Sequence, residues 1–523
     1  MRTRSNPVRG GWAAVTVAAA AWAATAWGDF RVEPYLQNPT EGAVTVMWLS
    51  QSADPGTLTV QTPGGPLQWT STPVLASALA YHSSEGADPG VPYVHRVRVT
   101  GLEAGTRYDY AVEQNGVQRG ASLATAPQLN TAIRFMVYAD SETEPASTGK
   151  AVAWADPTGV KADRTYVVDQ TVGYQENLRV MASRSPNFVA VAGDLVEAGG
   201  KQRDWDEFWR HNAGELGSLA SRTPIVAALG NHENYGGPGG FGGYSDAAAA
   251  RGVAKFKTYF EAPSNGAANP AHHGRYHRMD YGPVTYITLD TSDGSPQGED
   301  SDTNWHLANA DGAAPDFNPG SPQYQWLEGQ LQHARDRGSK FIFVQFHHAP
   351  YSVGPHGLAA SVDKQSGLPV RTLTPLFKQY GVAAVFSGHD EMYEHSLVEG
   401  IHFYDIGIGG DGLRGPIAGL TNPHQLFLAH TDAPEVWDGN RLVSGGKHYG
   451  HLEVNVTQNA DGTWQAQLLP VYVFPIMDAT GHVTGWERRI YDDVTTLTAI
   501  PEPAGSAVLL SALMLARRRQ PSR

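Results

Sequence analysis

Side chains that can bind metal ions or move protons follow five segments that are expected to be buried strands. In chain order they are Asp140, Asp194, Asn231 with His232, His347 with His348, and His389. A hydrolytic pair of metal ions needs carboxylate and nitrogen ligands, including one carboxylate able to bridge the two ions. Because the chain has no cysteine, nitrogen and oxygen ligands must hold any metal. The five segments therefore predict a dinuclear metal site.

The pattern is densest in the segment Leu229-Gly230-Asn231-His232-Glu233. This segment follows an apolar run at 223–228 and precedes the glycine-rich stretch 235–243. An Asn and a His at a strand end, bracketed by glycine, suit a metal ligand placed beside a phosphate contact. Taken alone, the segment fits an ordinary turn equally well. Its place among five similar strand ends favours the metal site.

Composition limits the classes of function. A chain of 523 residues is long enough for two folded units with terminal appendages. The net charge of -14 argues against a nucleic-acid surface, which needs a basic patch. A small phosphorylated substrate stays compatible with this charge, because metal ions can supply local positive charge. The lack of cysteine also excludes disulfides and thiol catalysis.

The first folded unit, residues 29–127, is expected to be an all-β sandwich. Runs at 43–49 and 93–99 alternate between apolar and polar residues, and Gly/Pro turns separate such runs. A sandwich of about 100 residues accounts for this spacing. The turn at 101–108 resembles the one that precedes a late strand in fibronectin type III domains. No residue in this unit is expected to carry catalysis.

The second unit, residues 132–475, alternates strands with helices. Strands are expected at 133–138, 187–192, 223–228, 285–289, 340–346 and 383–386, and helices at 166–183, 323–337 and 373–380. Such alternation predicts a mainly parallel α/β domain whose chemistry lies outside the carboxyl ends of its strands. The five polar segments all lie at such ends. Two strands, 451–457 and 464–472, are expected to close the domain, and 476–498 is expected to be a linker.

The N-terminus, residues 1–28, has the pattern of a secretory signal peptide. Arg2, Arg4 and Arg9 precede an alanine-rich apolar run at 12–27, which ends in small residues. A membrane anchor is the alternative, and the short, Ala-rich run disfavours it. We therefore expect the mature protein to be exported.

The C-terminus, residues 499–523, carries a second address. Pro501-Glu502-Pro503 is followed by an apolar stretch at 504–516 and then by three arginines at 517–519. This tripartite pattern resembles the PEP-CTERM sorting signal of Gram-negative bacteria, which an exosortase removes. The resemblance implies delivery to the cell surface or an extracellular matrix, with only transient membrane contact. A frayed terminal helix is the alternative.

The order of the motifs resembles the calcineurin-like metallophosphoesterase superfamily. The matching motifs are Asp140, Gly193-Asp194-Leu195-Val196, Gly230-Asn231-His232-Glu233, His348-Ala349-Pro350 and Gly388-His389. Purple acid phosphatase-like members are the most similar, because they also carry a fibronectin-like N-terminal domain. The resemblance covers residues 30–472. It implies an α/β domain of the αββα type with a dinuclear metal centre.

The resemblance also implies roles for individual residues. Asp140 would bind one metal and Asp194 would bridge the two. Asn231, His348 and His389 would hold the other metal, and His348 is preferred over His347 because it keeps the His-x-Pro spacing to Pro350. His347 could also be the ligand in place of His348.

Two further histidines have implied catalytic roles. His232, next to the ligand Asn231, would contact phosphate or protonate the leaving oxygen. His356 lies where the family places a substrate-binding histidine, although a solvated loop residue would look the same.

Three positions depart from the family pattern. Glu197 stands where purple acid phosphatases have the tyrosine that gives them their colour, so a colourless protein is expected. Glu391 replaces the second histidine of Gly-His-x-His, and Glu142 replaces the histidine of Asp-x-His. If Glu142 and Glu391 ligate, the first metal site is oxygen-rich and suits Mn, Mg, Ca or Fe better than Zn. If they do not, only the site formed by Asn231, His348 and His389 holds a metal.

The expected function is hydrolysis of a small phosphate ester by a metal-bridging hydroxide, with monoesters favoured over diesters. The expected cofactors are two divalent or Fe/Mn/Zn-type ions. The alternative is a non-catalytic matrix or adhesion protein that uses a degenerate scaffold to bind extracellular polysaccharide or another protein. Activity that depends on Asp194 would separate the two.

Overall fold

The computed structural model describes residues 30–147, 152–153, 165–166, 170–293, 303–310, 312–354, 367–411, 413–429 and 435–499. The expected signal peptide, all but the first residue of the expected sorting signal, and His356 lie outside the described residues. Within the described ranges, no helix combines the length and apolar character needed to cross a bilayer.

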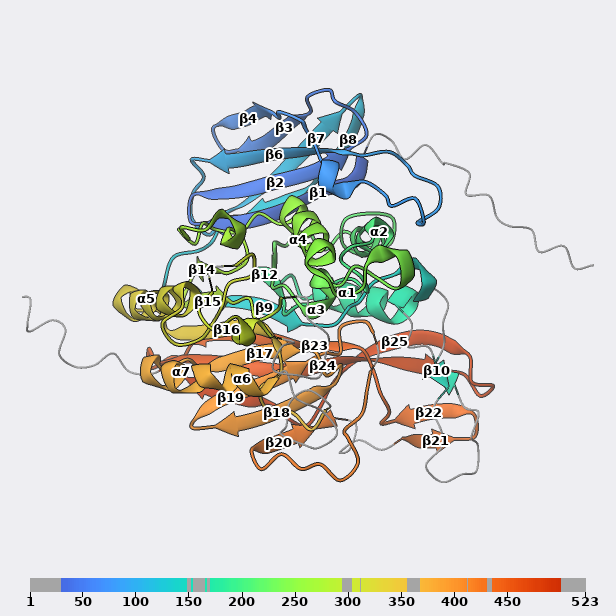
Figure 1. Ribbon diagram of the computed structural model, residues 1–523, viewed down its shortest axis with the longest axis vertical. Coiled ribbons are helices and arrows are strands. Elements are labelled where there is room, and N and C mark those ends of the chain that lie inside the picture. Colours follow the sequence, from blue (N-terminus) through green and yellow to red (C-terminus); the bar gives the residue numbers. More distant parts are fainter. Residues whose placement is uncertain are drawn as a thin grey trace, which may run out of the picture.

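The N-terminal unit is a sandwich of two four-stranded antiparallel sheets, drawn in blue in Figure 1. One sheet has the order β1-β2-β6-β5, with β1 Phe30–Thr40, β2 Ala43–Ser50, β6 Tyr93–Thr100 and β5 Val74–Leu75. The other has the order β4-β3-β7-β8, with β4 Gly65–Thr70, β3 Thr57–Thr62, β7 Arg107–Gln114 and β8 Val117–Ala124. Alternate side chains meet between the sheets, where Trp48 is fully buried. This confirms the expected β-sandwich.

Two seven-stranded sheets form the centre of the second unit. The first sheet contains β13 Ile225–Ala227, β12 Phe188–Val191, β9 Ile133–Tyr138, β23 Gly450–Gln458, β24 Trp464–Met477, β25 Val483–Ile490 and β26 Thr495–Thr498. The second contains β14 His277–Tyr281, β15 Val284–Thr288, β16 Phe341–His348, β17 Ala384–Gly388, β19 Ile401–Ile406, β18 Tyr393–Val398 and β20 Gln425–Leu428. In each sheet the strands that lead into the polar segments are parallel.

Helices cover the outer faces of the two sheets (Figure 1). The helices are α1 Gln175–Ser183, α2 Gln202–Asn212, α3 Asn231–Asn234, α4 Asp246–Tyr259, α5 Pro322–Arg337, α6 Gly367–Val370 and α7 Thr374–Tyr380. The α1, α2 and α4 helices share a core with the first sheet, and α5 and α7 share one with the second. The layers therefore follow the expected αββα order.

Aromatic side chains fill the space between the two sheets. Phe135 of β9 stacks on Phe188 of β12 at 4.7 Å between ring centroids, and Phe343 of β16 meets Phe135 at 5.5 Å. All three rings are completely buried. This shared core fixes the two sheets relative to each other, so that the strand ends of both sheets can contribute to one site.

Two segments differ from expectation. Residues 476–498 include β25 and β26, both paired with β24, so this stretch extends the first sheet where a linker is expected. Apolar and polar residues alternate only weakly in this stretch, and each strand packs on only one face. The sequence therefore did not predict these strands. The helix expected at 166–183 is seen as α1 from Gln175, preceded by a π-helical turn at Gln170–Tyr174.

The sandwich packs directly on the second unit. Tyr35 of β1 is completely buried, its ring lies 4.2 Å from that of Trp209 in α2, and its hydroxyl donates to the Tyr259 carbonyl at 2.9 Å. The sheet that contains β1 and β2 therefore buries both faces, which explains why every residue of β2 is buried. In Figure 1 this sheet lies next to α2 and α4.

Candidate metal centre

The five polar segments converge where the parallel strands of both sheets end. Asp140 and Asp194 follow β9 and β12, and Asn231 opens α3 after β13. His347 is the next-to-last residue of β16, and His389 directly follows β17. Each element is short and buried on both faces, so the strand ends are held rigidly.

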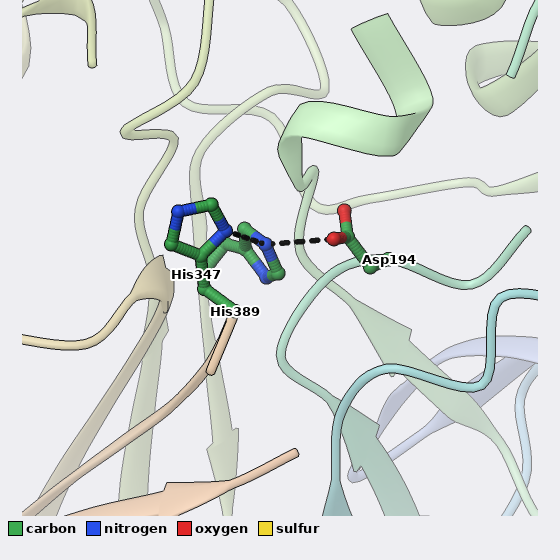
Figure 2. A group of neighbouring side chains, drawn as sticks. All are labelled: Asp194, His347 and His389. Atoms are coloured by element: carbon green, nitrogen blue, oxygen red, sulfur yellow. Dashed lines mark hydrogen bonds and ion pairs between the residues drawn. The ribbon is translucent and has the colours of Figure 1, made fainter. Parts of the chain in front are cut away.

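His347 lies at the centre of this group, as Figure 2 shows. Its Nε2 lies 2.9 Å from Asp194 Oδ2, 2.8 Å from Asn231 Oδ1 and 3.1 Å from His389 Nδ1. The Asn231 amide nitrogen donates to the Tyr244 hydroxyl at 3.2 Å, which turns its carbonyl oxygen toward His347. Two imidazoles, a carboxylate and an amide oxygen therefore meet at one point. This donor set suits a first-row divalent metal.

His348 points elsewhere. Its Nδ1 lies 2.9 Å from the Thr291 hydroxyl, and its ring packs 4.5 Å from the His389 ring. Adjacent residues of a strand face opposite sides, so only one of the two histidines can face Asp194. The structure therefore corrects the preference for His348: His347 is the histidine that meets Asn231 and Asp194. The spacing to Pro350 did not reveal which face of β16 the site occupies.

The turns that carry these side chains are in left-handed conformations. The φ angles of Asp140, Asp194 and His389 are 56°, 53° and 77°, and those of Glu142 and Glu391 are 35° and 50°. Such angles are uncommon outside glycine and collect at functional sites, where packing holds the strain. Five of the predicted ligands share this feature.

Two glycines let the loops approach one another. A Cβ at Gly230 would overlap the Asp194 carboxylate, and a Cβ at Gly388 would overlap that of Asp140. The Asp140 carboxylate in turn accepts the His389 backbone N–H, at 2.9 Å to Oδ2. Glycine beside the ligand positions is thus required by close packing.

Glu233 holds two of the loops together. Its carboxylate accepts the backbone N–H groups of Asp194 at 3.0 Å, Leu195 at 2.8 Å and Gly230 at 2.7 Å. The residue is completely buried. The motif Gly230-Asn231-His232-Glu233 alone did not predict this role for Glu233; its position three residues after Gly230, which caps α3, was the available signal.

A second group of carboxylates lies beside the first. Single oxygens of Glu142, Glu197 and Asp411 lie within 4.8 Å of one another, and Glu142 also forms such a group with Asp194 and His232. Glu197 occupies the position where the family pattern has tyrosine. Asp411 was missed, although it follows β19 and a glycine pair, as the other segments follow their strands.

Glu391 is the other carboxylate expected to bind the first metal. It forms an ion pair with Arg414. Its Oε1 lies 2.6 Å from Nη2 of Arg414, and its backbone carbonyl accepts the Arg414 N–H at 2.9 Å. The structure thus brings Glu391 to the site but pairs it with Arg414.

His232 lies between the two groups. Its backbone N–H donates to Asp194 Oδ1 at 2.9 Å, and its Nδ1 lies 2.7 Å from the Glu197 carbonyl oxygen. A carbonyl only accepts hydrogen bonds, so Nδ1 carries the proton and Nε2 faces the site. That Nε2 lies 3.9 Å from Glu142 Oε1.

Burial and mutual repulsion shape the charges of the centre. Burial raises the pKa of Glu142 well above its ordinary value, and Glu391 and Asp411 raise it further. Burial lowers the pKa of His347, but Asp194 outweighs it and raises the pKa to about 10. A cation that enters such a cluster offsets the repulsion among its carboxylates and favours their ionised forms. The centre is therefore suited to metal ions.

Comparison with known proteins agrees with this geometry. Residues 163–392 match the calcineurin-like phosphoesterase family, and residues 30–126 match the purple acid phosphatase N-terminal domain. An uncharacterized protein of Mycobacterium tuberculosis is 28% identical over 354 residues, which cover 65% of this chain and 58% of that protein. A probable inactive purple acid phosphatase of Arabidopsis thaliana is 27% identical over 207 residues, which cover 39% of this chain and 28% of that protein.

Solved structures share the fold. A purple acid phosphatase from yellow lupin seeds superposes with a TM-score of 0.59 at 18% identity, covering 89% of this chain and 74% of that chain. The fold and the site therefore define a metallophosphoesterase architecture. The second unit of the chain is therefore similar to calcineurin-like phosphoesterases, and its first unit to the N-terminal domain of purple acid phosphatases.

Proposed function

We propose that the protein is a metal-dependent hydrolase of small phosphate esters. The observation that carries this proposal is the convergence of Asp194, Asn231, His347 and His389 at one buried point. The match of residues 163–392 to the calcineurin-like phosphoesterase family and the donor chemistry support a dinuclear centre. We assign His347, Asn231 and His389 to one metal and Asp140 to the other, with Asp194 between them.

Two metal ions bound there would activate a water molecule and neutralise charge on the phosphate group. The residues of the chain would do the rest. Asp194 faces His347 through one oxygen and the His232 loop through the other, so it can span both halves. His232, held at Nδ1 by the Glu197 carbonyl, would in its imidazolium form present Nε2–H to the leaving oxygen and give it that proton. We expect monoesters to be preferred over diesters.

For the first half-site we propose an oxygen-rich ligand set of Asp140, Glu142, Glu197 and Asp411. The spacing of the last three carboxylates supports this, while the ion pair with Arg414 favours a smaller part for Glu391 than the sequence predicted. Hard oxygen ligands favour Mn, Mg or Ca over Zn. Without a tyrosine ligand the protein would be colourless.

The test combines metal content with turnover. We expect two metal ions per chain in the purified protein, and hydrolysis of p-nitrophenyl phosphate that exceeds that of bis-p-nitrophenyl phosphate in the presence of Mn, Fe, Zn, Ca or Mg. The variant Asp194→Ala should lose turnover, whereas Asp461→Asn, at an exposed turn, should not change it. No turnover with any ester and any metal would overturn the proposal.

The second candidate is a non-catalytic matrix protein on the same scaffold. The Glu391–Arg414 ion pair favours it, because a built-in cation occupies part of the first half-site. One relative is itself described as probably inactive. Binding of polysaccharide that survives Asp194→Ala, together with one metal or none per chain, would support this candidate.

We also propose that the protein is exported and sorted to the cell surface or an extracellular matrix of a Gram-negative bacterium. The two terminal sequence patterns support this. The mass of the mature protein should show that both terminal segments have been removed, and fractionation should find the protein outside the cytoplasm. An unprocessed chain in the cytoplasm would contradict it.

A further inference from the structure

Two tyrosines form an aromatic pair beside the metal centre. The rings of Tyr235 and Tyr244 lie 4.6 Å apart between centroids, at an interplanar angle of 31°. The Tyr235 ring also lies 6.0 Å from that of His232, and the Tyr244 hydroxyl accepts the Asn231 side-chain N–H at 3.2 Å. The pair therefore adjoins both a proposed metal ligand and the proposed general acid.

The glycine-rich loop between the two tyrosines closes on itself. The Gly236 N–H donates to the Gly243 carbonyl at 2.9 Å, and the Gly243 N–H donates to the Gly237 carbonyl at 3.0 Å. The φ angles of Gly237 and Gly243 are 104° and 54°, which glycine adopts more readily than other residues. Because these bonds join the two ends of the loop, the tyrosines that flank it lie side by side.

The backbone of Tyr235 is also held from outside the loop. Its carbonyl accepts the Gly200 N–H at 3.0 Å, and its own N–H donates to the His232 carbonyl at 3.1 Å. At the tip of the loop, the Lys201 ammonium group lies 5.8 Å from the centre of the Phe241 ring. These contacts fix the position of the aromatic pair relative to His232.

Tyr235 keeps a surface on which a ligand can pack. The residue is partly exposed, and within the described part of the chain no residue forms a hydrogen bond with its hydroxyl. Tyr244, by contrast, orients Asn231. An exposed aromatic surface next to the proposed acid suits a second aromatic ring, because stacked and edge-to-face ring pairs gain more than the area that they bury.

We propose that Tyr235 selects phosphate esters whose leaving alcohol carries an aromatic ring. This inference rests on the proposed function and names its substrate class. In that reaction His232 gives its Nε2 proton to the leaving oxygen, so the oxygen must lie within hydrogen-bond reach of that atom. An aromatic ring close to this oxygen then reaches Tyr235, whose ring lies 6.0 Å from that of His232. Tyr235 determines specificity and takes no part in the chemical step.

The tyrosine pair also has a purely structural explanation, in which the two rings only cover each other. That explanation requires an apolar side chain of similar size at residue 235, but not an aromatic one. It gives no reason for a difference between aromatic and saturated substrates of similar size. A comparison of two such substrates therefore separates substrate selection from packing.

The experiment compares benzyl phosphate with cyclohexylmethyl phosphate as substrates of the full, metal-loaded chain. Both esters release a primary alcohol and both carry a six-membered ring, so they differ mainly in whether that ring is aromatic. We expect kcat/KM to be about fivefold or more higher for benzyl phosphate. The difference should lie in KM, because the ring contact exists in the bound substrate and in the transition state alike.

Variants assign the preference to Tyr235. Tyr235→Leu should bring the two kcat/KM values to within about twofold, whereas Tyr235→Phe should keep the preference because the ring remains. Tyr380→Leu is the matched control and should leave the preference unchanged. Tyr380 is also partly exposed, and it ends α7 near the start of β17, whose other end leads to His389. If Tyr235→Leu does not fold, Tyr235→Met is measured in the same way.

The outcomes separate this inference from the proposed function. Equal kcat/KM values for the two esters, or an unchanged preference in Tyr235→Leu, would overturn the inference and leave the proposed function standing. No turnover with any ester would overturn the proposed function. Titration calorimetry with benzylphosphonate and cyclohexylmethylphosphonate then tests the contact without turnover. Tighter binding of the aromatic analogue that is lost in Tyr235→Leu would support the contact, and equal affinities would overturn it.

Discussion

His347 and His348 are neighbours in the chain but face different surroundings. His347 Nε2 meets Asp194, Asn231 and His389, whereas His348 Nδ1 meets the Thr291 hydroxyl. We predict that His347→Ala loses one metal ion per chain and about 100-fold or more in kcat/KM. His348→Ala should keep both ions, because the His348 ring packs against that of His389 while its Nδ1 meets the Thr291 hydroxyl. Metal analysis of the two variants decides, and metal loss in His348→Ala alone would contradict the assignment.

At the residue scale most of the side chains singled out from the sequence lie together in the structure, because residues of these types recur at strand ends. Asp140, Asp194, Asn231 and His389 all come together as expected. The choice between His347 and His348 depends on which face of β16 meets the site. That face is set by packing of the second sheet, so the local sequence left it open.

Carboxylates that replace family ligands were harder to place. Glu142 and Glu391 both reach the centre, but only the structure shows that Arg414 pairs with Glu391. Glu197 and Asp411 join through contacts between separate loops. Spacing along the chain carries no information about such contacts.

At the scale of elements, Glu233 ties the loop after β12 to the start of α3. It does so with three backbone N–H groups on a fully buried carboxylate. We predict that Glu233→Gln lowers the free energy of unfolding by about 3 kcal/mol, since the amide oxygen accepts fewer of these bonds and the NH2 group then faces backbone donors. Urea unfolding measures this. The exposed Glu328→Gln of α5 is the control and should change stability little; an equal effect in both would contradict the clamp.

Glu453 of β23 joins two further elements. It accepts hydrogen bonds from Arg184 after α1 at 2.9 and 3.0 Å, and from Arg488 of β25 at 2.9 Å. Burial alone would raise its pKa, but the bonds from Arg184, Asn455 and Arg488 lower it to about 2. The arginines are partly exposed, so we expect Glu453→Gln to cost about 2 kcal/mol at pH 7.

The pH dependence of that cost has a definite sign. The pKa of Glu453 is about 2 in the folded protein, below the ordinary value of 4.5, so its contribution is complete above about pH 4.5 and is lost as the pH falls toward 2. The stability gap between the protein and Glu453→Gln should therefore be roughly halved at pH 3. Urea unfolding at pH 7 and pH 3 measures it. A gap that grows on acidification would show that the carboxylate does not stabilise the fold as an anion.

Element prediction succeeded where hydrophobic period was strong. The six expected strands of the second unit between 133 and 386 are all present, because buried parallel strands read as apolar runs. The π-helical start of α1 and the strands at 483–498 were not predicted. The strands at 483–498 face solvent on one side, and they form because they pair with β24, which their own sequence does not indicate.

At the scale of the whole molecule, the sandwich and the second unit share one apolar core. Val32, Met47 and Leu49 of the sandwich pack with Trp205 and Trp209 of α2. Burial on this scale couples the stability of the two units, so a single unfolding transition is expected for the whole protein.

Asp206 of α2 tests this coupling. Its Oδ2 lies 2.5 Å from Nη2 of Arg31 and accepts the Tyr81 hydroxyl at 2.5 Å, and both partners belong to the sandwich side. Asp206→Ala leaves a mostly buried arginine without its counter-ion and should cost about 3 kcal/mol. Arg119→Gln, whose partner Glu33 lies within the sandwich, is the control and should cost less than about 1 kcal/mol.

Because the two units are coupled, Asp206→Ala should lower the unfolding midpoint of both together. Tryptophan fluorescence and far-UV circular dichroism should give coincident urea transitions in the protein and in the variant. Two separate transitions in the unmodified protein would show that the sandwich is an independent unit. In that case the rigid packing of β1 and β2 on α2 and α4 would not contribute to holding the metal centre.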